Sequence, residues 1–406
     1  MRVLIVLTYY RPHTSGLTIY AERLAKGLAE QGHEVTVLTS RYARRLPADE
    51  IVDGVHVVRS PVLFRVSKGV IMPFFGLQAW KWVNWADVVS LHLPQFDAAG
   101  IALRGRLLGK PTVLTYHCDL QLPPGLFNRL VNGVVRGMNN LAGRFSHRVV
   151  AYTEDFAEHS PFLRRFTDKI EVIPPPVELP DAGDSGRAAF AKMHNPEDKH
   201  PVIGMAARFA SEKGVGVLLD AFPRILEEYP DARILYAGQY RDVMGEQEYF
   251  EKLAPQIRRY RDMGKWTFLG VLTPLQMAAF YPNLDVIVVP SLNSTESFGL
   301  VQVEAMLRGT PSVASDLPGV RQPVLQTGMG EIAPVGDAGG LAEAILKVLD
   351  DRASYVRPSE EIAAMFSTER TVHDYEALFG RLCEGAGVDA VHAESSTISQ
   401  NLRGAE

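Results

Sequence analysis

Apolar and polar positions alternate along the chain in two successive series of short apolar segments and longer amphipathic ones. In the first series, strands are expected at residues 3–8 and 34–39, with a helix at 18–31 that stops at Gly32. Further apolar strands follow at residues 55–59, 87–92, 112–117 and 148–153. Strands that alternate with helical or loop segments in this way predict a parallel, doubly wound α/β sheet.

A proline-rich segment separates this series from a second one. Residues 173–180 read IPPPVELP, with four prolines, which suits a stiff hinge better than a helix or strand. After it, strands are expected at 202–206, 233–237, 265–269, 286–290 and 311–314, with helices at 216–229, 249–263 and 298–308. This pattern predicts a second open α/β sheet. Because such sheets bind ligands at the carboxyl ends of their strands, we expect two facing domains with a cleft between them.

The pattern also predicts the domain boundaries. We expect an N-terminal Rossmann-like domain at 1–172, a hinge at 173–180, and a second Rossmann-like domain at 181–360. A helix at 361–385 is expected to close the fold. Residues 386–406 are rich in small and polar side chains, and we expect a disordered tail there.

Composition narrows the class of protein. With 406 residues, 46% of them hydrophobic and 22% charged, the chain can bury a large core in more than one domain. No apolar run reaches the roughly 18 residues of a membrane span, and the first residues do not resemble a signal peptide, so we expect a cytoplasmic protein. Cys118 and Cys383 are too few for a disulfide framework. The net charge of −5 gives no reason to expect nucleic acid as a partner, and the oligomeric state is not predicted.

Candidate chemistry is concentrated in residues 294–306, STESFGLVQVEAM, where Glu296 and Glu304 stand at either end of an apolar run. If the helix begins after Ser297, the backbone amides of Phe298, Gly299 and Leu300 lie at its positive end, where phosphate or sugar oxygens bind. Glu304, six residues after Phe298, would lie about 9 Å from it along the helix axis, at roughly 1.5 Å per residue. That spacing is comparable to the length of a nucleotide-diphosphate sugar.

Three segments carry a resemblance to a known family. ESFGLVQVEAMLRGTPSVASDLPGVRQPV resembles the signature of the retaining glycosyltransferases of the GT-B fold, family four, which includes phosphatidylinositol mannosyltransferase-like, glycogen-synthase-like and sucrose-synthase-like enzymes. YYRPHTSGLTIYAERLAKGLAEQGHEVTVLT and GMAARFASEKGVGVLLDAF match the family pattern in the same order. The resemblance implies an acceptor-binding N-terminal domain, a nucleotide-sugar-binding C-terminal domain, and a UDP- or GDP-linked donor substrate with no further cofactor.

The resemblance also assigns roles in the second domain. It implies that Glu296 holds hydroxyls of the transferred sugar, and that Glu304 accepts hydrogen bonds from the ribose. Arg208 and Lys213, between a strand and a helix, would clamp the diphosphate and stabilise the charge of the leaving nucleotide. There is no Asp-x-Asp pair and no His, Cys and carboxylate cluster with ligand spacing, so we do not expect a metal ion.

In the first domain the candidates are a glycine and a histidine. Gly16 lies between the first strand and the first helix, where a glycine lets the backbone approach a phosphate or sugar. The family usually has two adjacent glycines here, whereas this chain has SGL. The resemblance implies that His117, at the end of a strand, contacts the donor sugar through its ring or its backbone carbonyl. His92 and Asp119 are weaker candidates for the acceptor side.

These features predict a retaining hexosyltransferase, with either front-face attack or Glu296 as a covalent nucleophile. A dinucleotide-dependent oxidoreductase would share the architecture, but the G-x-G-x-x-G fingerprint is missing after the first strand. A sugar-binding protein would need no diphosphate clamp. A nucleotide-sugar epimerase of the same fold stays open, since it binds the same donor without an acceptor.

The acceptor is predicted from charge. Residues 54–153 contain eleven Lys and Arg against three acids, a net of +8 in a protein whose total is −5. Residues 125–145 contain arginines and apolar side chains but no acid, and Trp80, Trp82 and Trp85 flank Lys81. This composition favours a peripheral enzyme that glycosylates a lipid or lipid-linked glycan on an anionic inner membrane surface, with a soluble sugar acceptor as the alternative.

Overall fold

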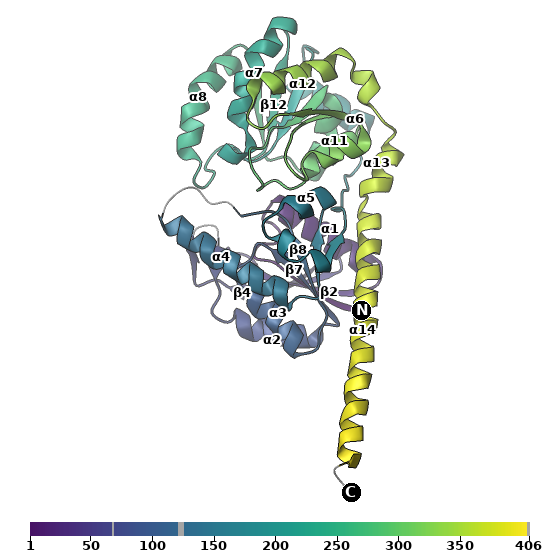
Figure 1. Ribbon diagram of the computed structural model, residues 1–406. Helices are drawn as coiled ribbons and strands as arrows, with labels where there is room; N and C mark the ends of the chain where they lie inside the picture. The colour runs from purple at the N-terminus through teal and green to yellow at the C-terminus, as the bar shows by residue number, and fades with distance from the viewer. Residues whose placement is uncertain (67–68, 121–125, 404–406) are drawn as a thin grey trace. The chain divides into compact units, whose positions relative to one another are not determined.

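The chain folds into two compact units, each built on its own sheet (Figure 1). The computed structural model describes the backbone of residues 1–66, 69–120 and 126–403, and the side chains of residues 1–65, 69–120 and 129–385. Unit 1 comprises Met1–Pro176 together with the segment that starts at Thr368, and unit 2 comprises Val177–Ser367. The prediction of two Rossmann-like sheets and a C-terminal helix is confirmed.

Unit 1 contains an eight-stranded sheet in the order β10-β9-β8-β7-β1-β2-β4-β3. The strands are β1 (Arg2–Val6), β2 (Glu34–Arg41), β3 (Asp49–Val52), β4 (Val55–Pro61), β7 (Val88–Leu93), β8 (Thr112–Tyr116), β9 (Arg148–Ala151) and β10 (Ile170–Val172). All neighbours pair in parallel except β3, which is antiparallel to β4. In a separate two-stranded sheet, β5 (Phe64–Val66) pairs antiparallel with β6 (Gly69–Ile71).

The central strands of unit 1 were predictable because both faces are covered, so they form continuous apolar runs. Every residue of β7 and of β8 is buried. The edge strand β3 was missed, because it is mostly exposed and begins with two acids. The helices of this unit are α1 (Gly16–Glu30), α2 (Phe75–Trp85), α3 (Ala98–Leu107), α4 (Leu126–Phe145), α5 (Glu154–His159) and α14 (Thr368–Arg403).

Helix α14 returns to unit 1 after the chain has formed unit 2, and it packs against α1 (Figure 1). Gly27 of α1 allows this contact, because a Cβ there would lie 2.5 Å from Cγ2 of Val372. The backbone of α14 is helical to Arg403, so no helix end marks the predicted boundary at residue 386. The disordered tail stays a prediction, since the side chains beyond residue 385 lie outside those described.

Unit 2 contains a six-stranded, fully parallel sheet in the order β13-β12-β11-β14-β15-β16. Its strands are β11 (Val202–Ala206), β12 (Arg233–Ala237), β13 (Trp266–Gly270), β14 (Val286–Val289), β15 (Ser312–Ser315) and β16 (Gly330–Ala333), the last not predicted. Its helices are α6 (Gly183–His194), α7 (Val215–Glu228), α8 (Gln247–Asp262), α9 (Pro274–Phe280), α10 (Leu300–Met306), α11 (Gln322–Thr327), α12 (Ala338–Asp350) and α13 (Ser359–Phe366).

The chain passes from one unit to the other twice, after Pro176 and after Ser367. The first crossing lies inside the proline-rich segment at 173–180. The backbone N–H of Val177 donates to the carbonyl of Phe366 at 3.0 Å, so the two crossing segments lie side by side. The domain boundaries predicted at 172, 181 and 360 stay predictions. The two compact units divide after Pro176 and after Ser367.

Candidate functional site

Each sheet has a point where the strand order reverses, and parallel α/β sheets bind ligands at such points, beyond the carboxyl ends of the strands. In unit 1 this point lies between β1 and β7, and in unit 2 between β11 and β14. Arg208 and Lys213 follow β11, while Glu296 follows β14. Gly16 follows β1, and His117 follows β8, the neighbour of β7. The topology therefore places each predicted site residue at or beside a reversal point.

In unit 2 a glycine brings two loops together. Lys213 ends a 3₁₀ turn, Ser211–Lys213, and Gly214 after it has φ +74°. A Cβ on Gly214 would lie 1.8 Å from the carbonyl oxygen of Pro290, so only glycine fits here. The loops are also tied by a hydrogen bond of 2.9 Å from the N–H of Leu292 to the carbonyl of Glu212.

The result is an ion pair at the centre of the candidate site. Nζ of Lys213 donates to Oε2 of Glu296 at 2.7 Å, and both side chains are largely shielded from solvent. The other oxygen, Oε1, accepts the backbone N–H of Gly299 at 3.1 Å. The sequence had suggested this amide as a donor to the ligand. In the structure it holds the carboxylate instead, because Glu296 lies three residues before it and reaches back to the helix start.

The helix after Glu296 begins later than predicted. Helix α10 starts at Leu300 rather than Phe298, because Gly299 adopts φ +77° and caps it. Gln302, which sequence reasoning missed, explains the tight turn. Its amide nitrogen donates to the carbonyls of Phe298 and Val320 at 2.9 and 3.0 Å, and it is completely buried. Nothing in the sequence distinguishes Gln302 from an exposed helical glutamine.

Arg208 lies beside the same turn. Its Nη2 donates to Oε1 of Glu212 at 3.0 Å, and its side chain is 41% exposed, so the guanidinium stays accessible to an anion. The turn itself is anchored by Glu246, another residue that the sequence did not single out. Glu246 is buried, and its Oε2 accepts the backbone N–H of Ser211 at 2.9 Å. Lys213 therefore projects from a turn that is fixed at both ends, and Arg208 lies beside this turn.

Glu304 is the buried carboxylate that the apolar run predicted, at 6% exposure on α10. The hydroxyl of Tyr281 donates to its Oε2 at 2.6 Å. Tyr281 is itself held by Thr310, whose hydroxyl donates to the Tyr281 carbonyl at 2.6 Å. One carboxylate oxygen of Glu304 is thus fixed from inside the unit. Tyr281 was not identified from the sequence, because it is distant along the chain.

In unit 1, Gly16 is the first residue of α1. The helix is capped by Ser15, whose Oγ accepts the N–H of Thr18 at 3.2 Å. Gly16 does not have a positive φ, and a Cβ added there meets no atom within 4 Å. Neither the backbone conformation nor packing within the described chain requires glycine at this position.

His117 lies in a buried cluster at the ends of β7 and β8. Nδ1 of His92 and Nε2 of His117 are 2.9 Å apart, and the hydroxyl of Tyr152 is hydrogen-bonded to Nδ1 of His117. Burial lowers the pKa of His92 to about 3, and burial together with His92 lowers the pKa of His117 well below its usual value. Both rings are therefore neutral at pH 7. His92 is completely buried, and its suggested contact with the acceptor stays a prediction.

Asp119 has a positioning role within unit 1. Its Oδ1 accepts hydrogen bonds from the hydroxyls of Tyr116 at 3.0 Å and Ser160 at 2.7 Å. Burial and the adjacent carboxylate raise the pKa of Tyr116. These contacts tie the segment after β8 to the residues after α5.

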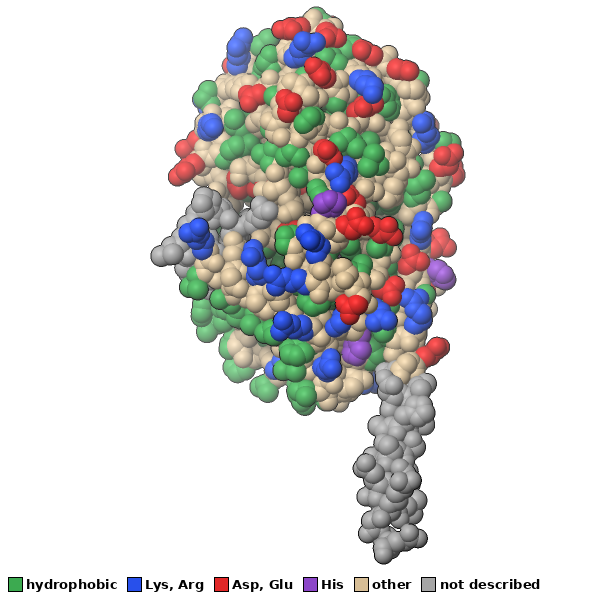
Figure 2. Space-filling model, viewed as in Figure 1, with side chains coloured by type: hydrophobic (Ala, Val, Ile, Leu, Met, Phe, Trp, Pro, Cys, Tyr) green, Lys and Arg blue, Asp and Glu red, His purple; other side chains and the backbone are tan. Residues whose placement is uncertain are grey.

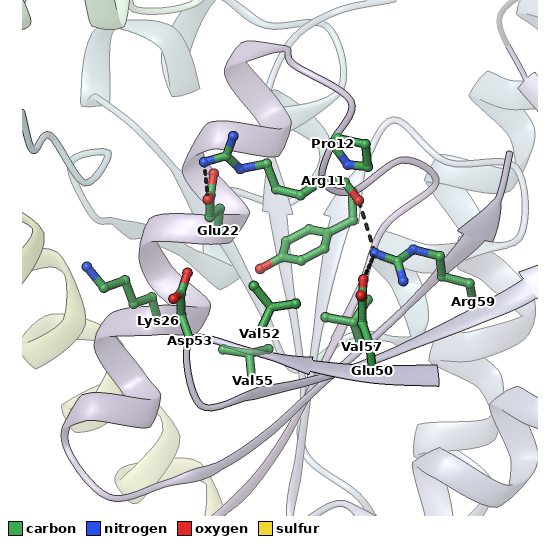
Figure 3. A pocket seen from close by; sticks show the side chains of 11 residues that line it. Arg11, Pro12, Glu22, Lys26, Glu50, Val52, Asp53, Val55, Val57 and Arg59 are labelled. Atoms are coloured by element: carbon green, nitrogen blue, oxygen red, sulfur yellow. Dashed lines mark hydrogen bonds and ion pairs between the residues drawn. The ribbon is translucent and has the colours of Figure 1, made fainter. Parts of the chain in front are cut away.

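A cavity of about 220 Å³ lies elsewhere in unit 1, between α1, β3 and β4 (Figure 3). Ion pairs cross it: Arg11 pairs with Glu22, and Arg59 pairs with Glu50 at 2.5 Å. None of the predicted site residues lines this cavity. Within the described ranges, no group of three or more His, Cys, Asp or Glu side chains could hold a metal ion.

Known proteins are similar to the chain over nearly its whole length. A family model described as Glycosyltransferase Family 4 matches residues 14–180, and one described as Glycosyl transferases group 1 matches residues 187–365. The chain is 28% identical to phosphatidyl-myo-inositol mannosyltransferase of Mycolicibacterium smegmatis over 370 residues, which is 89% of each chain. It is 27% identical to glycogen synthase of Mycobacterium tuberculosis over 380 residues, 88% of each.

Solved structures share the fold at low identity. The Anabaena protein HepE in complex with UDP aligns with a TM-score of 0.73 and 18% identity, covering 94% of this chain and all of HepE. Sucrose-phosphate synthase of Thermosynechococcus elongatus aligns with a TM-score of 0.72 and 19% identity, covering 95% and 99%. With two adjacent family models that together span most of the chain, and with this fold, the chain belongs to the retaining glycosyltransferases of family four and has the GT-B fold.

Proposed function

We propose that this enzyme transfers a hexose from a UDP- or GDP-linked donor to a lipid or lipid-linked glycan at an anionic membrane surface. The donor part of the proposal is supported by the cations of unit 2 and by the HepE structures, which contain UDP or UDP-glucose. The acceptor part is supported by the mannosyltransferase relatives, whose name specifies phosphatidyl-myo-inositol.

In unit 2, Arg208 and Lys213 bind the donor diphosphate. One cation on an anchored turn and one beside it are preorganised for the charge that grows on the leaving nucleotide, so little reorganisation is needed during reaction. Glu304 accepts hydrogen bonds from the ribose, with Tyr281 holding its other side. Glu296 holds hydroxyls of the transferred sugar, and the amides of Phe298, Gly299 and Leu300 form the helix start beside it.

The contacts of Glu296 favour front-face attack over a covalent intermediate. Lys213 holds one carboxylate oxygen and the Gly299 amide holds the other, and a carboxylate engaged in this way is a poorer nucleophile. In front-face attack the bond from the anomeric carbon to the phosphate oxygen breaks, and the acceptor oxygen bonds to the same face. The acceptor proton then passes to the departing phosphate oxygen.

In unit 1, Gly16 leaves room for an oxygen of the donor or acceptor. A glycine at the first helical turn lowers helix propensity, and neither backbone geometry nor internal packing requires it here. Space for a ligand would account for a glycine at this position. His117 contacts the transferred sugar, in line with the family resemblance.

Unit 1 has a group of exposed apolar side chains beside basic ones, and this group is the main support for a lipid acceptor. Figure 2 shows hydrophobic side chains gathered over α2 and the adjoining α3 and α4, with Lys and Arg beside them. The apolar side chains are Phe74, Leu77, Trp80, Leu103, Leu107, Leu130, Val134 and Leu141; Leu77 is 75% exposed. Trp82 and Trp85 pack on the core instead, so only Trp80 of the three tryptophans contributes.

This surface suits adsorption rather than insertion. In the described part of the chain, no helix combines the length and apolarity that crossing a membrane requires. Apolar side chains that reach the acyl boundary and arginines that attract anionic headgroups give a reversible attachment. A surface-bound enzyme would meet its lipid acceptor by diffusion in two dimensions.

Liposome co-sedimentation tests this proposal. Binding is expected to require anionic lipid and to fall with salt, because charge attraction is screened beyond about 10 Å at 0.1 M. Leu77→Ser and Arg136→Glu, the latter at an exposed arginine of α4, should weaken binding and transfer to a lipid acceptor. Leu325→Ser, at an exposed leucine of unit 2, should not. Indifference of the wild type to anionic liposomes at low salt would favour a soluble acceptor. Donor consumption without any acceptor requirement would point to an epimerase.

A further inference from the structure

The histidine cluster of unit 1 is a continuous buried chain of polar groups. It runs from Oγ of Ser90 to Nε2 of His92 at 3.4 Å, from His92 to His117 at 2.9 Å, and from His117 to the hydroxyl of Tyr152. All four residues are buried, and they come from β7, from the end of β8 and from the end of β9. The chain thus joins three adjacent strands at their carboxyl ends.

Each link determines where the protons of the next residue lie. Both histidines are neutral, so each ring carries one N–H. If Tyr152 donates to Nδ1 of His117, His117 is protonated at Nε2 and donates to His92. If His117 donates to Tyr152 instead, His92 must donate to His117. In either direction both ring nitrogens of His117 are hydrogen-bonded, and the ring has one orientation.

Aromatic packing encloses this chain. The ring of Tyr20 lies edge-on to His117, with centroids 4.9 Å apart, and is stacked on Tyr152 at 5.3 Å. The hydroxyl of Tyr20 is 2.8 Å from that of Tyr375 on α14, and Tyr375 is 2.7 Å from Oγ1 of Thr115 on β8. Helix α14 therefore completes the environment of His117, although it is the last helix in the sequence.

We propose that Tyr152 and His92 are positioning residues for His117, and that Tyr375 holds the Tyr20 ring against them. The inference rests on the proposed contact of His117 with the transferred sugar. Both ring nitrogens of His117 are already hydrogen-bonded, so a hydrogen bond from the ring to the substrate would have to replace one of these two. The cluster therefore contributes by fixing the position of His117. The backbone is fixed as well, since the N–H of His117 donates to the carbonyl of Leu93 at 3.0 Å.

Paired substitutions separate positioning from folding. Tyr152→Phe removes the bond to Nδ1 of His117, and His92→Leu removes the bond to Nε2. His92→Asn is the conservative control, because its side-chain amide can occupy the position of Nδ1 and keep the hydrogen bond. Each variant is compared with the wild type by thermal unfolding, by transfer kinetics and by ¹⁵N NMR of the histidine rings. A His117→Gln variant assigns the His117 signals.

We expect Tyr152→Phe and His92→Leu to lower kcat at least about tenfold and to change the donor KM less than about threefold. Both variants release the His117 ring from its fixed orientation but remove no contact that binds the donor. The His117 ring signals should change from one neutral tautomer to a mixture, and His92→Asn should restore both. Unchanged kcat and unchanged ring signals in Tyr152→Phe and His92→Leu would overturn the proposal. Loss of stability alone, with kcat intact in folded protein, would also overturn it.

Failure of this proposal can be distinguished from failure of the proposed function. A wild-type enzyme that transfers no hexose from any UDP- or GDP-linked donor would contradict the proposed function. The NMR spectra of the same proteins would still decide whether Tyr152 and His92 fix the His117 ring.

Discussion

Replacing Gly16 by alanine should change stability and activity in opposite directions. The added methyl group meets no atom of the described chain within 4 Å, and Gly16 does not need a positive φ. The Ser15 cap of α1 is unaffected. Alanine at a compatible helical position stabilises by about 0.4–1 kcal/mol, mainly by restricting the unfolded chain, and the first turn should give the lower end of that range.

The expected stabilisation corresponds to a small rise in melting temperature of unit 1, about 1–2 °C for a domain of this size. Activity should fall, because the methyl group occupies space proposed for a ligand oxygen. A loss of about 1.4 kcal/mol in transition-state binding is a tenfold fall in kcat/KM, and we expect at least that. Differential scanning fluorimetry and steady-state transfer kinetics measure the two quantities.

Two other glycines of unit 1 provide matched controls. Gly380→Ala on α14 also adds a methyl group that meets nothing within 4 Å, and it should stabilise without loss of activity. Gly27→Ala should destabilise, because its Cβ would lie 2.5 Å from Val372. A Gly16→Ala enzyme with wild-type kcat/KM would refute the role of Gly16, whatever its melting temperature.

Three further predictions concern named side chains. Glu296→Gln should mainly lower kcat and Glu304→Ala should mainly raise the donor dissociation constant, and kinetics that leave both quantities at wild-type values would contradict these roles. Arg208→Ala and Lys213→Ala should each raise the activation free energy by about 3–4 kcal/mol, which lowers turnover 10²- to 10³-fold, and both should retain the fold. Activity within tenfold of wild type would count against the diphosphate clamp. Since the folded pKa of His92 is about 3, below its ordinary 6.5, the unfolded chain takes up this proton as pH falls below 6.5; the contribution of His92 to stability is full above pH 6.5 and should fall by about 2 kcal/mol by pH 5. Urea unfolding at pH 7 and pH 5 should show at least this loss in the wild type, to which His117 also contributes, and a smaller loss in His92→Asn; equal losses would contradict the buried neutral state.

Periodicity revealed the strands and their class but not the contacts that assemble the site. Parallel strands such as β7 and β14 are buried on both faces, so their apolar runs are visible in the sequence. The β3 strand carries no such signal, because most of it is exposed. Glu304 stood out because a carboxylate interrupts an apolar helix, and the structure shows it buried.

Contacts between distant residues leave no periodic signal. Tyr152 reaches His117 across 35 positions, and Tyr281 reaches Glu304 across 23. The later start of α10 depends on Gly299 and on Gln302, whose amide bonds to two carbonyls that only the folded chain brings together. The sequence therefore indicated candidate site residues one by one, whereas their partners required the structure.

The most direct test of the account is time-resolved ¹H NMR of transfer from α-linked UDP- and GDP-hexoses in the presence of lipid acceptors and anionic vesicles. We predict that the first product formed is α-linked, that nucleoside diphosphate appears at the same rate, and that Lys213→Ala lowers both rates by about 10²- to 10³-fold. A β-linked first product, or transfer by Lys213→Ala within tenfold of the wild-type rate, would contradict a retaining mechanism centred on Lys213 and Glu296.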